Sequence, residues 1–161
     1  MQIITVHHPR ANILRRKAKP VGRVTPEVAR LLDEMVETMR AARGVGLAGP
    51  QVGLDRRLIV VEYGGTLYQL VDPELVRMEG EEWGTEGCLS IPGVTVDLRR
   101  AARVVVRAKN RRGRGITIQA EGWLARIFQH EIDHLDGILI TDRAERPEHI
   151  HRVEEELEVV G

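Results

Sequence analysis

The sequence has little of what marks secreted, membrane-spanning or nucleic-acid-binding proteins. It contains one cysteine, Cys88, so an internal disulfide is impossible, as is usual in a reducing compartment. No apolar run reaches the roughly 18 residues of a membrane span, and residues 1–10 do not resemble a secretory signal. The 24 basic residues equal the 24 acidic ones, so the overall positive field that attracts phosphate backbones is missing. We therefore expect a cytoplasmic protein with no membrane partner and no direct nucleic-acid binding.

Aromatic residues are also scarce, at 3% of the chain, so leucine, isoleucine and valine must form the core. Hydrophobic residues make up 42% and charged residues 30%, which is the composition of a globular protein. A chain of 161 residues is long enough for one core and too short for two. We predict a single domain over residues 1–161, in which the tail, from about residue 142 to residue 161, has the weakest pattern.

Two helices are predicted from apolar residues at helical spacing. The first begins at Thr25-Pro26, where a hydroxyl can cap the helix and a proline needs no hydrogen-bond partner, and it ends before Gly44. Its apolar face contains Val28, Leu31, Leu32, Met35 and Met39. The second runs over about residues 121–135, with Gly137 beyond its end. A weaker, acidic helical pattern covers residues 147–160.

Between these helices the sequence changes to alternating and β-branched patterns that are typical of strands. Five such segments are residues 58–62, 66–71, 94–98, 103–108 and 116–120. A Gly64-Gly65 pair separates the first two and is typical of a hairpin turn. The order helix, strands, helix predicts an α+β fold with short antiparallel strands and an N-terminal amphipathic helix.

The segment QHEIDHLDG, residues 129–137, contains two histidines four positions apart, with Glu131 directly after the first. On a helix, His130 and His134 lie on one face and can bind the same ion. The alternative is an exposed polar helix face without a metal. A catalytic zinc-like site also needs a third protein ligand and one open position.

The chain offers two sources of a third ligand. In the HExxH metalloprotease arrangement the ligand lies downstream, where the candidates are Glu145, Glu148, His149 and His151. The other source is Cys88, in the turn-like segment EGCLS. A lone cysteine in a reducing compartment is more often a small core residue than a ligand. The residue pattern leaves both sources open, and it also allows a structural metal module with four protein ligands.

A glycine-rich segment, GVGLAGPQVG at residues 44–53, contains the G-x-G-x-x-G pattern of dinucleotide-binding loops. That pattern normally follows a strand and opens a helix, whereas this segment follows a predicted helix and runs into Pro50. The sequence context therefore argues against nucleotide binding. Glycines this dense would instead let a substrate backbone approach closely, with Gln51 directed to the same place.

Together and in this order, GVGLAGPQVG, EGCLS and QHEIDHLDG resemble the signature motifs of the peptide deformylase family. The segments VDPEL, IPG and EGWLAR are also similar, so the resemblance extends to about Thr141. It implies an α+β fold of short antiparallel β-sheets packed around a central HExxH metal helix. It also implies a metal-dependent hydrolase that removes the N-formyl group from the N-terminal methionine of newly synthesised polypeptides and releases formate.

The resemblance implies a role for each matching residue. It implies three metal ligands, namely Cys88, His130 and His134. Glu131 is implied as the catalytic acid and base, and Gln51 with the backbone N–H of Leu89 as donors to the oxyanion. The substrate backbone would bind to Gly46. The methionine side chain would enter a pocket whose implied lining residues are Val45, Trp123, Arg126 and Ile127.

The implied cofactor is one divalent metal ion. The resemblance points to Fe(II), while cysteine and histidine ligands also accept zinc, nickel or cobalt. The implied partners are nascent peptides that begin with N-formyl-Met. The acidic EEELE segment, residues 154–158, would be repelled by RNA, so we carry over no ribosome-docking role to the tail, and ribosome association stays open. The first motif departs from the family pattern at Gly49 and Pro50, where alanine and threonine are frequent.

Overall fold

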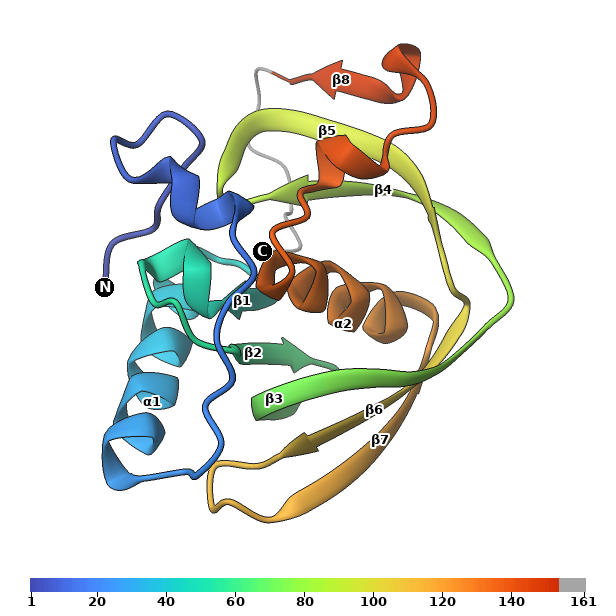
Figure 1. The fold of residues 1–161 in the computed structure, drawn as a ribbon. Helices are drawn as coiled ribbons and strands as arrows, with labels where there is room; N and C mark the ends of the chain where they lie inside the picture. Colours follow the sequence, from blue (N-terminus) through green and yellow to red (C-terminus); the bar gives the residue numbers. More distant parts are fainter. Residues whose placement is uncertain (154–161) are drawn as a thin grey trace.

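Helix α2 (Gly122–Leu135) lies between two antiparallel sheets (Figure 1). The structure, a computed structural model, describes residues 1–153. The larger sheet has the strand order β1-β2-β3-β6-β7, with the bounds Gly46–Ala48, Leu58–Tyr63, Thr66–Glu79, Arg103–Lys109 and Gly115–Glu121. The smaller sheet has the order β4-β5-β8, with the bounds Glu82–Cys88, Ile91–Arg100 and Ile150–Arg152. Helix α1 (Pro26–Ala41) covers the face of the larger sheet opposite α2.

Helix α1 begins where its sequence predicts. The N–H of Val28 donates to Oγ1 of Thr25 at 3.3 Å, which satisfies one of the free donors of the first turn. Pro26 occupies the first turn, where its missing N–H costs nothing. The buried side of the helix consists of Val28, Leu32, Met35, Val36 and Met39. This stripe anchors α1 on the larger sheet.

Strand β2 supports both helical layers. Leu58 and Val60 pack in the cluster that contains the buried face of α1, whereas Ile59 and Val61 pack in the cluster that contains Phe128 of α2. These four side chains of β2 are completely buried. Successive side chains of a strand point to opposite faces, so an uninterrupted apolar run fills two cores. The sheet therefore holds α2 at a fixed distance from α1.

A third apolar cluster lies under the smaller sheet. Ile4 and Leu14 from the N-terminal segment pack there with Val96 and Leu98 of β5. The cluster also includes Cys88, the last residue of β4. The beginning of the chain is thus packed against the segment EGCLS, far along the sequence.

The five predicted strands are all present; three are longer than predicted by one or two residues, and β3 and β5 extend several residues further. Strand β3 has 14 residues and β5 has 10. Gly64 and Gly65 both have positive φ, 62° and 80°, as a tight hairpin turn requires. The mixed helices and antiparallel sheets agree with the predicted α+β class. Strands β1, β4 and β8 were not predicted.

The predicted C-terminal helix over residues 147–160 is wrong in its first part. Pro147–His149 forms a short 3-10 turn, and Ile150–Arg152 then pairs with β5 as β8. Proline and the β-branched Ile150 suit this turn and strand better than a helix. The rest of that prediction lies outside the described residues.

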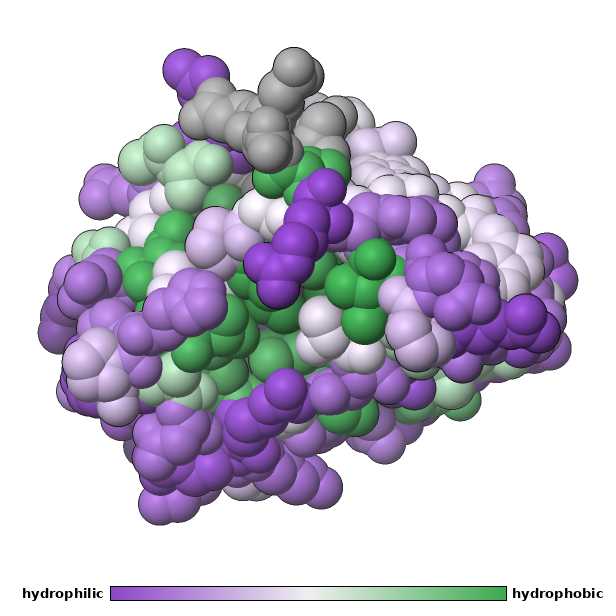
Figure 2. Space-filling model, turned by 90° about the horizontal axis from the view of Figure 1, so that it is seen from above, coloured by the Kyte–Doolittle hydropathy of each residue, from purple (hydrophilic) through white to green (hydrophobic). Residues whose placement is uncertain are grey.

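Figure 2 shows the molecule from above, relative to the view of Figure 1. Polar side chains dominate the edge of this face. Apolar side chains gather nearer the middle of this face. Among residues 1–153, no helix is both long and apolar enough to span a bilayer.

Candidate metal centre

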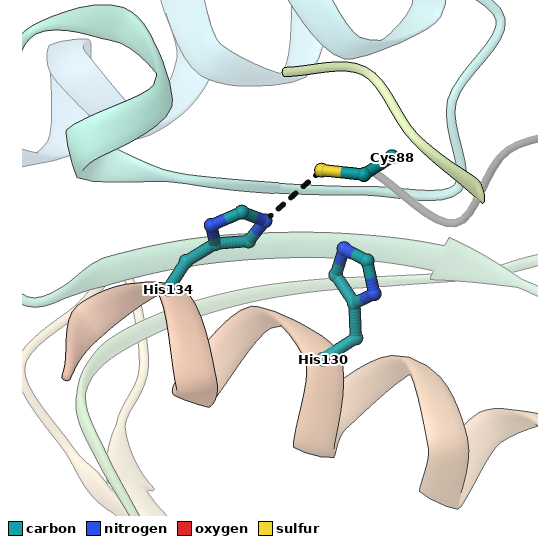
Figure 3. Close-up of side chains that lie close together, drawn as sticks. All are labelled: Cys88, His130 and His134. Atoms are coloured by element: carbon teal, nitrogen blue, oxygen red, sulfur yellow. Dashed lines mark hydrogen bonds between the residues drawn. The ribbon is translucent and has the colours of Figure 1, made fainter. Parts of the chain in front are cut away.

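Cys88, His130 and His134 meet inside the molecule (Figure 3). One ligand atom from each residue lies within 4.8 Å of the other two. The Sγ atom of Cys88 is 3.4 Å from Nε2 of His134. Ligands at the bond lengths usual for zinc, in a tetrahedral arrangement, are spaced by roughly 3.3 to 3.8 Å. A thiolate and two imidazoles at this spacing fit one transition-metal ion.

Two elements far apart in sequence supply these ligands. His130 and His134 are on the same face of α2, one turn apart, and their rings lie 5.0 Å apart at the centroids. Cys88 ends β4, directly before the two-residue turn to β5. The register of β4 and β5 shifts between Gly87 and Cys88, and such an irregularity re-aims a side chain. Cys88 is therefore both a buried member of a core cluster and a partner of the two histidines.

The downstream candidates for a third ligand lie elsewhere. Glu145 pairs with Arg99. His151 pairs with Asp97 at 2.8 Å, and His149 stacks edge-on against Trp83. In residues 1–153, the third donor beside the two histidines is thus the cysteine and not a residue of the tail.

Glu86 contacts the imidazole of His130 at Nδ1. A role for Glu86 was not predicted from the sequence. Its Oε1 lies 2.8 Å from Nδ1 of His130. Arg100 donates to both carboxylate oxygens at 2.9 Å, and Arg126 donates to Oε2 at 2.8 Å. Burial alone would raise the pKa of Glu86, but the hydrogen bonds with His130 and Arg100 outweigh it and hold the pKa well below its usual range. Glu86 is therefore a buried, ionised carboxylate.

The carboxylate of Glu131 is also fully buried, but its surroundings differ from those of Glu86. Neither of its oxygens has a hydrogen-bond partner among the described residues. Burial raises the pKa of Glu131 to about 8, although the neighbouring His130 opposes this. A Cβ atom on Gly46 would come within 2.3 Å of Oε2 of Glu131. The glycine of β1 is thus needed for the carboxylate to lie beside the candidate metal ligands.

Gln51 lies beside Cys88, in the 3-10 turn Gly49–Val52. Its Oε1 accepts the N–H of Ala48 at 2.9 Å. Its Nε2 is 3.8 Å from Sγ of Cys88 and 3.1 Å from Oγ of Ser90. Leu89, between Cys88 and Ser90, is half-buried. The two implied oxyanion donors therefore flank the same cysteine.

The residues implied for the methionine pocket divide into two groups. Val45 and Trp123 are partly buried and pack against the cluster that contains Ile127. Arg126 points the other way, because its guanidinium donates to Glu86 and also to the carbonyl of Glu82 at 2.7 Å. Three of the four residues thus share one apolar region, and the fourth belongs to the support of His130.

A cysteine and two histidines beside a buried, unsatisfied carboxylate define a metal-dependent hydrolase. The family model of polypeptide deformylase matches residues 1–149. A peptide deformylase of Symbiobacterium thermophilum is 56% identical over 146 residues, which cover 89% of this chain and 67% of that protein. One of Desulfitobacterium hafniense is 49% identical over 136 residues, covering 84% of this chain and 91% of that protein.

Solved structures agree with these relatives. A peptide deformylase of Thermus thermophilus is 44% identical, with a TM-score of 0.85 over 92% of this chain and 89% of that one. A peptide deformylase of Synechococcus elongatus, in complex with actinonin, is 39% identical, with a TM-score of 0.87 over 92% of this chain and 81% of that one. The chain belongs to the peptide deformylase family. It is a hydrolase that removes the N-formyl group from the N-terminal methionine of newly synthesised polypeptides.

Proposed function

We propose that Cys88, His130 and His134 hold the single divalent ion on which this deformylase activity depends. The observation that carries the proposal is that their ligand atoms lie within 4.8 Å of one another in a buried site. Three protein ligands leave one position open for chemistry. A divalent ion bound there supplies a Lewis acid, which lowers the pKa of water and polarises a carbonyl oxygen.

Fe(II) is the ion that we assign to the protein in the cell. The resemblance to the deformylase motifs supports iron, and one thiolate with two imidazoles also suits zinc, nickel and cobalt. Raw affinity favours zinc over Fe(II) in such a site, so purified protein can carry a different ion from the one it uses in the cell.

Glu131 is the catalytic acid and base in this proposal. Its buried carboxylate is next to the metal ligands, and its raised pKa lies close to neutral pH, where a group can both accept and release a proton. Glu131 takes a proton from the attacking water as the new C–O bond forms at the formyl carbon. It then gives that proton to the amine nitrogen as the C–N bond breaks, which releases formate.

Two donors stabilise the negative oxygen that forms on the formyl carbon. They are Nε2 of Gln51 and the backbone N–H of Leu89, on either side of Cys88. Each donor of this kind contributes roughly 3 to 4 kcal/mol to transition-state stabilisation in other hydrolases. Gln51 is completely buried and Leu89 lies in a turn between two paired strands, so the two donors need little reorganisation during the reaction.

The substrate backbone binds along Gly46 of β1, and the methionine side chain enters the apolar region formed by Val45, Trp123 and Ile127. Support for this comes from the shared cluster of the three apolar residues and from α2, which carries Ile127 as well as His130 and His134. A role of Arg126 in the pocket stays a prediction. The hydrogen bond of its guanidinium with Glu86 argues against that role. The single-domain assignment over residues 1–161, the cytoplasmic location and the absence of nucleic-acid binding also stay predictions. Ribosome association stays open.

The experiment that tests the proposal is formate release from a formyl-Met peptide, with an acetyl-Met peptide as control. We expect a free methionine amine only from the former, together with formate, complete loss after chelation, and recovery on addition of Fe(II), Ni(II) or Co(II). Casein cleavage that survives Cys88→Ala would instead indicate an HExxH protease with a different third ligand. Binding of zinc by Cys88, His130, His134 and a fourth protein ligand, without hydrolysis, would indicate a structural metal module.

A further inference from the structure

Two loops meet at a pair of completely buried polar side chains. Gln51 is in the turn Gly49–Val52 and Ser90 is in the turn between β4 and β5. Both are 0% exposed. The amide nitrogen of Gln51 donates to Oγ of Ser90 at 3.1 Å. A buried amide N–H needs such a partner, because leaving it unsatisfied costs free energy.

The contacts of Gln51 fix which way its amide faces. The N–H of Ala48 can only donate, so the atom 2.9 Å from it must be the amide oxygen. The amide nitrogen therefore points toward the β4–β5 turn and carries two N–H groups. One of them is taken by the hydroxyl of Ser90. The other faces Cys88, whose Sγ is 3.8 Å from the nitrogen.

We propose that Ser90 is a positioning residue for deformylation: its hydroxyl holds one N–H of Gln51 so that the other stays on the side of Cys88, where the oxyanion forms next to the proposed ion. The inference rests on the proposed role of Gln51 as an oxyanion donor. Ser90 itself touches neither the substrate nor the ion in this account. Its effect is on the rotation of one amide group.

The backbone contacts of the two loops show why this effect is separable from folding. The N–H of Ile4 donates to the carbonyl of Gln51 at 2.7 Å, and the N–H of Val6 donates to the carbonyl of Ser90 at 2.9 Å. The same N-terminal segment thus holds both loops by their backbones, independently of the Ser90 hydroxyl. Removing that hydroxyl leaves these contacts in place, so the loops keep their spacing while the amide of Gln51 gains freedom.

Steady-state kinetics of Ser90→Ala on a formyl-Met peptide test the proposal. Removing an oxyanion donor costs about a hundredfold to a thousandfold in kcat, so a donor that is present but free to rotate should cost about tenfold. We expect kcat to fall by this factor with KM unchanged, because the interaction exists only in the transition state. Metal content should stay close to that of the wild type, and the unfolding temperature should fall by only a few degrees, because one buried N–H loses its acceptor.

The matched control is Thr95→Ala. Thr95 is a second almost buried hydroxyl residue, on β5, and its side chain is not among the contacts of Gln51 in residues 1–153. We expect this variant to keep the wild-type kcat. Ser90→Cys keeps the size of the side chain but replaces the hydroxyl with a weaker acceptor, and it takes the place of Ser90→Ala if the alanine variant does not fold.

A double-mutant cycle separates positioning from a general structural role. If Ser90 acts through Gln51, then adding Ser90→Ala to Gln51→Ala should lower kcat no further. An equal fold-loss in both backgrounds, or a Ser90→Ala variant with wild-type kcat, would overturn the inference. A Gln51→Ala variant with wild-type kcat would instead show that the proposed oxyanion role of Gln51 has failed.

Discussion

Glu86 Oε1 lies 2.8 Å from Nδ1 of His130, and the two residues are 44 positions apart in the chain. An ionised carboxylate accepts only, so Nδ1 of His130 carries a proton and Nε2 is the nitrogen left to bind an ion. That is the form of histidine that binds a metal ion. Glu86 thereby fixes both the tautomer and the orientation of the proposed ligand.

Glu86→Gln should lower the metal affinity by about tenfold to a hundredfold, which is the usual effect of losing such a supporting carboxylate. It should also lower the unfolding temperature, since Arg100 and Arg126 lose their buried anion. Competition with a chelator for zinc measures the affinity. Glu81→Gln, on an exposed residue paired with Arg99, is the control. An unchanged dissociation constant for Glu86→Gln would contradict the support role.

Cys88→Ala should lose more activity than Gln51→Ala. The first removes a ligand of the ion, and the ion's effect on the pKa of water, about 8 units, corresponds to about 11 kcal/mol. The second removes one oxyanion donor, worth roughly 3 to 4 kcal/mol. Formate release and metal content of both variants decide the order. Similar residual rates in the two variants would count against the proposed ligand set.

Elements with a regular apolar pattern could be predicted from the sequence. The helical spacing of His130 and His134 already places both imidazoles on one face, and β2 was recognisable from its β-branched run. The cysteine was harder, because one buried sulfur suits a core as well as a metal. Its neighbours favoured the role of a ligand only through the likeness of three ordered motifs to one family.

Strand β4 shows why other parts could not be predicted. Its sequence, EWGTEGC, has none of the alternation of a half-buried strand. Its buried charged residue, Glu86, is satisfied by Arg100, Arg126 and His130, and partners so distant in sequence are not visible in a local pattern. Three-dimensional pairing, and not propensity, therefore decides the conformation of this strand.

The prediction for strand β3 ended too early, at residue 71, for a different reason. The dipeptide Asp72-Pro73 normally indicates a turn. Asp72 does adopt positive φ, 51°, but its carboxylate accepts the N–H groups of Val21 and Gly22, each at 2.8 Å. The pairing with β6 shifts register there and then continues to Glu79. A local turn signal was thus absorbed as a bulge within a longer strand.

The iron-loaded enzyme should lose activity gradually in air. A thiolate ligand beside a redox-active ion offers two oxidisable centres, whereas nickel and cobalt at the same site are less readily oxidised. Half-lives of formate release under air and under nitrogen, for protein loaded with each metal, test this. Equal half-lives in air for all three metals would contradict this expectation.

The stability of the metal-free protein should fall as pH rises through neutrality, because of Glu131. The ordinary pKa of this carboxyl is 4.5 and the folded value is about 8. Between these two values the folded state keeps a proton that the unfolded state has released, so the free energy of unfolding decreases with increasing pH. The stabilisation is fully present below about pH 4.5 and is lost above about pH 8.

Glu131→Gln has no carboxyl to ionise at this position, so its metal-free form should show a flatter pH dependence. At pH 8.5 the variant should be more stable than the metal-free wild type by an amount on the order of 4 kcal/mol, from about 1.4 kcal/mol for each pKa unit. At pH 5 the two proteins should differ little. Urea unfolding of both proteins after chelation, at pH 5 and pH 8.5, measures the effect. Parallel pH curves would show that the buried carboxyl of Glu131 does not carry the penalty that its surroundings imply, and they would remove the physical basis for its role as the catalytic acid and base.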